Sequence, residues 1–192
     1  MTGALRILPE LPVDAGPILL AIARDALLRR FGRAGMPWTD EIWLAKPAAT
    51  FVTLEQDGAL RGCIGTLEAR RALREDVSHN AVAAALHDDR FPPLAAAELD
   101  AIGIEVSLLS GPELRPAASE AEAARLVRPG IDGVILSAGG CSATYLPQVW
   151  DHFANPVAFL RALKRKAGLP DGWSREMRLS TYQVRHWRER AT

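Results

Sequence analysis

The segment ALRGCIGTLE, residues 59–68, holds the side chain with the clearest capacity for chemistry. Cys63 is flanked by Gly62 and Gly65, and Arg61 precedes it by two residues. A thiolate is a strong nucleophile, and a nearby guanidinium favours the thiolate over the thiol. Cysteine is also one of the most frequently buried residue types and packs like a small hydrophobe. Spacing alone leaves both interpretations of Cys63 open and favours the packed residue.

A β-hairpin is the element expected to position this cysteine. Two apolar runs meet at the Asp-Gly pair of residues 57 and 58, which is a strong signal for a two-residue turn. Such a turn pairs Val52 with Cys63 and Leu54 with Arg61. Because cross-strand partners share a face, we expect Arg61 and Cys63 on one face, about 6 to 7 Å apart along the strand.

Helical and strand patterns alternate along the rest of the chain. Helices are expected over residues 13–32, 74–89, 118–130 and 155–168, which are bounded by capping, Pro and Gly signals. Strands are expected over residues 101–110 and 177–187, and a second hairpin over residues 132–147 turns at 139–140. That hairpin places Cys141 on an apolar face with Val134 and Leu136, which indicates a core position. Together these elements predict an α+β fold, with a mainly antiparallel sheet flanked by helices.

Composition excludes several classes of protein. The 192 residues contain 23 Lys and Arg against 23 Asp and Glu, so bulk charge gives no attraction to nucleic acid. The two cysteines form no CxxC or Cys/His cluster, and no cofactor motif is present, so neither a metal nor a cofactor is expected. No apolar run reaches the roughly 18 residues that span a bilayer. We therefore expect no membrane association and a cytoplasmic protein with free thiols.

The remaining polar residues carry weaker signals. Asp88 and Asp89 end a helix before Arg90, and we expect them to hold this arginine or to cap the loop. No histidine stands beside Cys63 as a base, because all four are scattered along the chain: His79, His87, His152 and His186.

Several motifs, taken in order along the chain, resemble one known family. The segments FVTL, LRGCIG, DDRFPPL, IEVSLLS, YLPQVW and FLRALKRKAGLP are similar to those of the AMMECR1 domain family, whose bacterial members are protein A of the AmmeMemoRadiSam system. The resemblance implies two subdomains, a larger one from residues 1–117 and 151–192 and a smaller one inserted at 118–150. It also implies a Memo-like protein, which resembles ring-opening dioxygenases, and a radical S-adenosylmethionine protein as partners.

The shared motifs, together with the local spacing, select the candidate site residues. The catalytic candidates are Cys63, as nucleophile, and Glu105; the substrate-binding candidates are Arg61, Gly62, Gly65, Arg90 and Gln148.

Three functions remain open at this stage. The first is a cysteine-dependent enzyme acting on a small anionic substrate, because two arginines near one thiol suit an anion. The second is a non-catalytic scaffold or regulatory partner, in which the hairpin and the RFPPL segment form a docking face. The third and weakest is nucleic-acid binding through the basic segment from Arg161 to Arg190.

Overall fold

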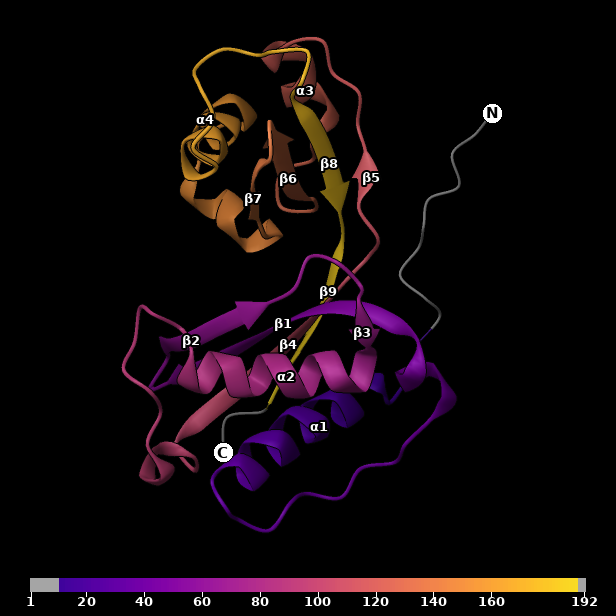
Figure 1. The fold of residues 1–192 in the computed structure, drawn as a ribbon, viewed down its shortest axis with the longest axis vertical. Helices are drawn as coiled ribbons and strands as arrows, with labels where there is room; N and C mark the ends of the chain where they lie inside the picture. The colour runs from indigo at the N-terminus through magenta and orange to yellow at the C-terminus, as the bar shows by residue number, and fades with distance from the viewer. Residues whose placement is uncertain (1–10, 190–192) are drawn as a thin grey trace. The chain divides into compact units, whose positions relative to one another are not determined.

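The computed structural model describes residues 11–189, which form two compact units (Figure 1). The larger unit comprises residues 11–109 and 185–189, and the smaller unit is the continuous segment Ser110–Val184. This division differs from the subdomain boundaries that we predicted near residues 117 and 150. The chain leaves the larger unit directly at the end of a strand, eight residues before the predicted boundary at 117, so residues 110–117 and 151–184 belong to the smaller unit.

A five-stranded sheet with two helices on one face forms the larger unit. Alternate residues of the central strands, such as Val52 and Ile104, are buried against these helices and make the core. The helices are α1 (Ala15–Arg30) and α2 (Leu73–Leu86), with short 3-10 turns η1 (Ile42–Ala45) and η2 (Ala96–Glu98). The sheet order is β2 (Ala59–Gly65), β1 (Pro47–Gln56), β4 (Ile102–Leu109) and β9 (Val184–Arg188), and β3 (Arg71–Ala72) pairs with β1.

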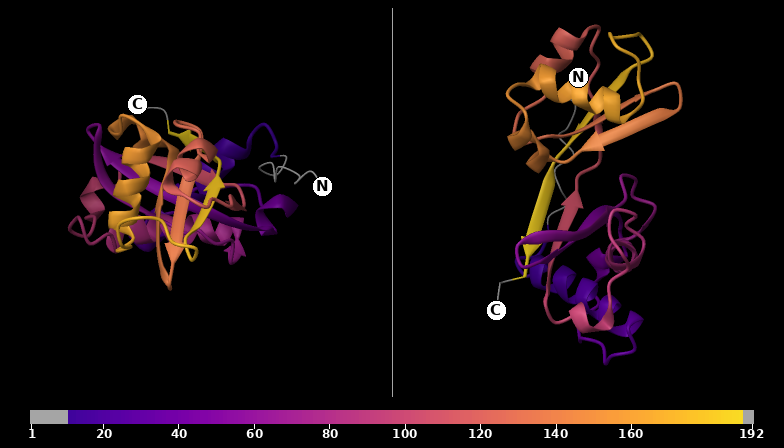
Figure 2. Two further views of the ribbon diagram at one scale, coloured as in Figure 1. Left: turned by 90° about the horizontal axis from the view of Figure 1, so that it is seen from above. Right: turned by 90° about the vertical axis from the view of Figure 1, so that its left-hand side faces the viewer.

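The smaller unit has the same α+β construction on a reduced scale. Its helices lie on one side of a four-stranded sheet (Figure 2), and Phe159 stacks on Trp150 in the core between them. The sheet order is β5 (Glu113–Leu114), β8 (Arg178–Tyr182), β6 (Gly133–Ala138) and β7 (Cys141–Tyr145). The helices are α3 (Glu120–Leu126), η3 (Pro147–His152) and α4 (Pro156–Lys166). The predicted α+β class is confirmed in both units.

The second hairpin has the predicted register, but its cysteine is not in the core. Leu136 pairs with Ala143 and Val134 with Tyr145, as the turn at residues 139–140 predicts. Cys141 shares that face but follows the turn directly and is exposed. The predicted core position of Cys141 is therefore wrong.

The first hairpin departs from its predicted register after two residue pairs. Glu55 pairs with Leu60 as predicted, but a β-bulge leaves Arg61 unpaired, so Leu54 pairs with Gly62. Such a bulge moves every later residue of β2 to the opposite face. Cys63 consequently pairs with Thr53 and not with Val52.

Candidate functional site

Cys63 lies on the sheet face that the helices do not cover. Its partner Thr53 stands between it and Glu105 of β4 in the register of the three strands. The Thr53 hydroxyl donates to the Cys63 Sγ at 3.4 Å. The predicted apolar surroundings of Cys63 are thus replaced by a polar row, and the thiol is half-buried within it.

The backbone of Cys63 is held by two side chains from the loop that follows α2. The Cys63 N–H donates to Oδ2 of Asp88 at 2.8 Å, and Arg90 Nη2 donates to the Cys63 carbonyl oxygen at 3.3 Å. β2 is an edge strand, whose outward N–H and C=O groups would otherwise be open to another chain. Asp88 and Arg90 therefore close this edge at Cys63.

Asp88 and Arg90 also bind each other, as we expected from their positions at the helix end. Oδ1 of Asp88 accepts from Arg90 Nε at 2.9 Å, and Oδ2 accepts from Arg90 Nη2 at 2.7 Å. The hydrogen bonds from this guanidinium hold the pKa of the Asp88 carboxyl well below its ordinary value. Asp88 is buried, and because these hydrogen bonds lower its pKa it keeps its negative charge at neutral pH.

The protonation state of Cys63 is set mainly by burial. Burial raises the pKa of the Cys63 thiol, and the negative charges of Asp88 and Glu105 raise it further. The Thr53 hydrogen bond and the charge of Arg90 act in the opposite direction but do not overcome burial. A reactive cysteine needs a lowered pKa, so these surroundings favour the neutral thiol.

Arg61 does not lie beside Cys63 as a thiolate partner. The bulge turns it toward η2, where its Nε donates to Glu98 Oε1 at 2.8 Å and its Nη2 to Glu98 Oε2 at 3.2 Å. Its Nη1 donates to the Pro92 carbonyl oxygen at 2.9 Å. Glu98 in turn accepts from the Ala95 N–H, which fixes the end of the same loop. Arg61 thus anchors the loop to β2.

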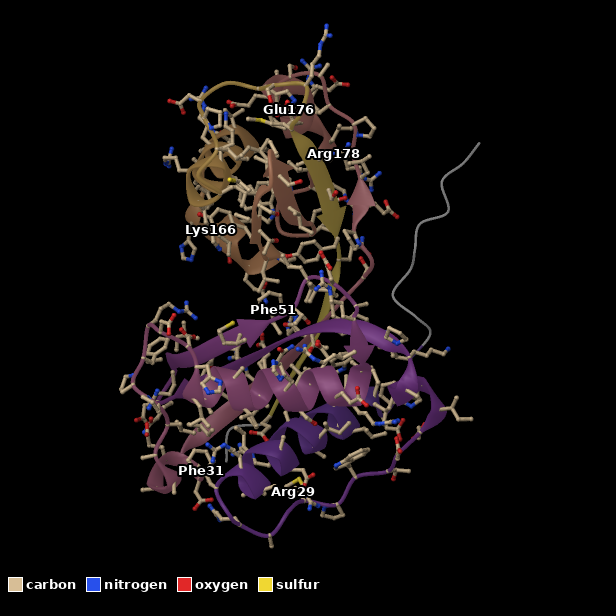
Figure 3. The ribbon with its side chains drawn as sticks, viewed as in Figure 1. Arg29, Phe31, Phe51, Lys166, Glu176 and Arg178 are labelled. Atoms are coloured by element: carbon tan, nitrogen blue, oxygen red, sulfur yellow. The ribbon has the colours of Figure 1, made fainter. Side chains whose placement is uncertain are left out.

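The two glycines of the motif are explained by close packing. A Cβ on Gly62 would lie 2.1 Å from the carbonyl oxygen of Ala84 in α2, so only glycine lets β2 approach the helix. A Cβ on Gly65 would lie 2.2 Å from the ring of Phe51, which is labelled in Figure 3 and covers this glycine from β1. Packing within the chain thus accounts for both glycines, and their contact with a substrate stays a prediction.

Glu105 and Gln148 have different surroundings from the rest of the candidate residues. Glu105 accepts from Arg188 Nη2 at 3.1 Å, so this carboxylate is already paired with a cation. Gln148 lies in the smaller unit, where it is exposed on η3. Its neighbour in the LPQVW motif, Trp150, is buried and donates from Nε1 to the Asp132 carbonyl oxygen at 2.7 Å. Packing of Trp150 accounts for part of this motif.

The sequence did not predict that Glu98 pairs with Arg61 or that Asp88 accepts a hydrogen bond from the Cys63 N–H. Asp88 belongs to the shared DDRFPPL motif, and this membership could have marked it as a candidate site residue. Glu98 stands 37 residues from Arg61 and lies in none of the motifs, so nothing local indicated the pair.

Metal binding and membrane spanning find no support within residues 11–189. No group of three or more His, Cys, Asp or Glu side chains in that range is arranged to hold a metal ion. The helices of the same range are all too short or too polar to cross a bilayer.

The fold and the motif contacts define an α+β protein of two units in which LRGCIG and DDRFPPL bind each other. The AMMECR1 family model matches residues 20–187, and the chain belongs to this family. This finding confirms the resemblance that the motifs indicated.

Relatives and a solved structure agree with this assignment. The chain is 36% identical over 186 residues to a protein of Methanothermobacter thermautotrophicus, covering 92% of this chain and 95% of that relative. It is 40% identical over 177 residues to a protein of Sulfolobus acidocaldarius, covering 87% and 78% of the two chains. The crystal structure of the uncharacterized protein PH0010 from Pyrococcus horikoshii has a TM-score of 0.80 at 31% identity and covers 91% of each chain.

Proposed function

We propose that the chain is a non-catalytic binding partner that docks through the loop between α2 and η2, residues 87–95, and through η2 itself. We call residues 87–98 the RFPPL loop. The observation that carries this proposal is that both arginines of the LRGCIG and DDRFPPL motifs, Arg61 and Arg90, already bind groups of the chain itself. Arg61 and Arg90 hold the loop to β2 and are each paired with a carboxylate.

The outer side of the RFPPL loop suits a protein partner. Pro92, Pro93, Ala95, Ala96 and Ala97 are all exposed, while Leu94 between them is buried and its N–H donates to the Ala85 carbonyl oxygen. The loop therefore presents a short apolar surface on a backbone that is held at several points. Such preorganisation lowers the entropy cost of binding.

The Memo-like protein and the radical S-adenosylmethionine protein of the same system are the partners that family membership suggests. The test is calorimetric titration of the chain with each protein at micromolar concentration. Ala96→Arg places a charge on the loop surface and should weaken binding at least about tenfold. Ala121→Arg, at an exposed alanine of α3, is the matched control and should bind normally. Failure of both proteins to bind, or equal loss with both variants, would refute the proposal.

A cysteine-dependent enzyme acting on a small anion is the alternative, favoured by one observation, the partial exposure of Cys63. Iodoacetamide labelling at neutral pH separates the two. Because burial raises the pKa of Cys63, we expect the exposed Cys141 to be labelled first and Cys63 slowly. Rapid labelling of Cys63 in the native chain would favour the enzyme instead.

A further inference from the structure

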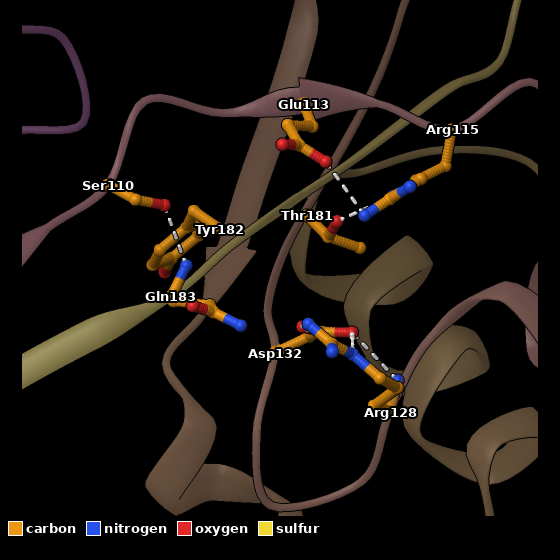
Figure 4. Close-up of a pocket in the computed structure, with 8 residues that line it drawn as sticks. All are labelled: Ser110, Glu113, Arg115, Arg128, Asp132, Thr181, Tyr182 and Gln183. Atoms are coloured by element: carbon orange, nitrogen blue, oxygen red, sulfur yellow. Dashed lines mark hydrogen bonds and ion pairs between the residues drawn. The ribbon is translucent and has the colours of Figure 1, made fainter. Parts of the chain in front are cut away.

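The smaller unit contains a hollow that none of the candidate site residues line. It lies between β5, β8 and the segment that joins α3 to β6, and about 270 Å³ of open space lies within it (Figure 4). Two arginines, Arg115 and Arg128, line it from different segments, together with the side chain of Gln183. Two guanidinium groups therefore lie at one small hollow, an arrangement that suits an anionic group.

Arg128 is fixed in place by a buried carboxylate. Asp132, whose side chain is only 2% exposed, accepts from Arg128 Nη2 at 2.7 Å and from the Arg128 backbone N–H at 2.9 Å. One edge of the guanidinium is thereby occupied, while 49% of the Arg128 side chain stays exposed. Within residues 11–189 its Nη1 donates to no protein group.

Arg115, which directly follows β5, is also held in place by hydrogen bonding and an ion pair. Its Nε donates to the Thr181 hydroxyl at 3.0 Å, and its Nη2 lies 2.8 Å from Glu113 Oε2. Its Nη1 likewise makes no hydrogen bond within the described residues. Both arginines therefore offer spare N–H donors from guanidinium groups whose positions are already set, which lowers the entropy cost of binding.

The charges on the rim select the class of ligand. The exposed fractions of the Arg115 and Arg128 side chains are 37% and 49%, against 29% for Glu113 and 2% for Asp132. Among the described residues that line the hollow, the charged side chains that reach solvent are therefore Arg115, Arg128 and Glu113. We propose that this hollow binds the carboxylate of a small zwitterionic ligand, an amino acid, with its ammonium group on the side of Glu113.

The geometry favours such a ligand over a phosphate. A carboxylate matches the planar fork of a guanidinium and carries one negative charge. A phosphate brings up to two negative charges toward Glu113 and Asp132, so repulsion is larger for it. This inference is independent of the RFPPL loop, since the two sites share no residue.

Nitrogen-15 NMR of the full chain provides the test. Glycine, acetate and inorganic phosphate are titrated at constant ionic strength while the Nε–H signals of Arg115 and Arg128 and the amide signals of Gln183 are followed. We expect chemical-shift changes that saturate with glycine. The affinity for acetate, which lacks the ammonium group, should be lower, and the affinity for phosphate should be the lowest. Arg115→Gln should raise the glycine Kd about tenfold, and the exposed Arg165→Gln should leave it unchanged.

A second variant protects the test against misfolding. Gln183→Ala removes only a side chain, because the hydrogen bonds that Gln183 makes with Ser110 use its backbone. We expect it to weaken glycine binding about threefold, as for loss of one neutral hydrogen bond. Chemical-shift changes that grow linearly with the concentration of every ligand would overturn the proposal that the hollow is a binding site. An equal loss of glycine affinity in Arg115→Gln and Arg165→Gln would overturn it as well. Tighter binding of phosphate than of glycine would overturn the ligand class.

Discussion

Replacement of Asp88 by asparagine should loosen the contact between β2 and the RFPPL loop. The carboxylate of Asp88 accepts one hydrogen bond from the Cys63 N–H and three from Arg90. A hydrogen bond to a charged group stabilises by about 1.5 to 3 kcal/mol. The Arg90 side chain is 56% exposed, so its ion pair adds no more than about 1 kcal/mol. We therefore expect Asp88→Asn to lower the free energy of unfolding of the larger unit by about 2 to 3 kcal/mol.

Urea unfolding checks this magnitude, provided that the two units are observed separately. Hydrogen exchange of peptides from β1 and β2 reports on the larger unit alone. With a urea dependence of about 2 kcal/mol per M, the midpoint should fall by about 1 to 1.5 M. Asp89→Asn is the matched control, because Asp89 is exposed and neighbours Asp88 in the chain. It should change the free energy by less than about 0.5 kcal/mol.

The pH dependence supplies a second check with a definite sign. The folded pKa of Asp88 lies below its ordinary value of 3.8. The stabilisation is therefore complete above the unfolded pKa and is lost as pH falls toward the folded one. The difference between the wild type and Asp88→Asn should be constant above about pH 5 and should narrow below about pH 4. Equal losses for Asp88→Asn and Asp89→Asn, or a difference that widens in acid, would refute the reasoning.

Three further predictions concern packing, the second ion pair and a buried phenol. Gly62→Ala should destabilise by about 1 to 3 kcal/mol in urea, because its Cβ meets helix backbone, whereas Gly103→Ala, with open space around it, should cost less than about 1 kcal/mol. Glu98→Gln should cost about 1 to 2 kcal/mol, and the exposed Glu68→Gln less than about 0.5 kcal/mol. Burial raises the pKa of Tyr182 to about 12, so absorbance at alkaline pH should show Tyr182 ionising late. Stability should fall between pH 10 and about 12, and ionisation of Tyr182 near pH 10 would contradict this.

The sequence predicted the fold class and both hairpin turns, because these depend on local signals. Asp57 adopts a positive φ of 52° and Gly58 one of 76°, as a two-residue turn requires. The caps were also readable: the Ser119 hydroxyl accepts from the Glu122 N–H, and Asn155 accepts from the Ala158 N–H.

The candidate site was harder to predict than the fold, because one β-bulge determines which side chains surround Cys63. Nothing near the turn distinguishes a regular hairpin from one in which Arg61 is left unpaired. The bulge is stabilised by distant contacts, the packing of Gly62 on α2 and the pairing of Arg61 with Glu98. A register shift of one residue then moves each later side chain of β2 to the opposite face of the sheet. This is why Cys63 was expected beside Val52 and is instead beside Thr53.

The place where the smaller unit joins the chain bears on the closing of the larger sheet. β4 and β9 are neighbours in one sheet, yet residues 110–183 separate them in the chain. Pairing them first would close a loop of about 75 residues at an entropy cost. The ends of that segment are already fastened together, since the Ser110 N–H donates to the Gln183 carbonyl oxygen and the Gln183 N–H donates to the Ser110 hydroxyl. These hydrogen bonds hold the start of β9 close to the end of β4, so the native smaller unit keeps this long loop closed for the larger sheet.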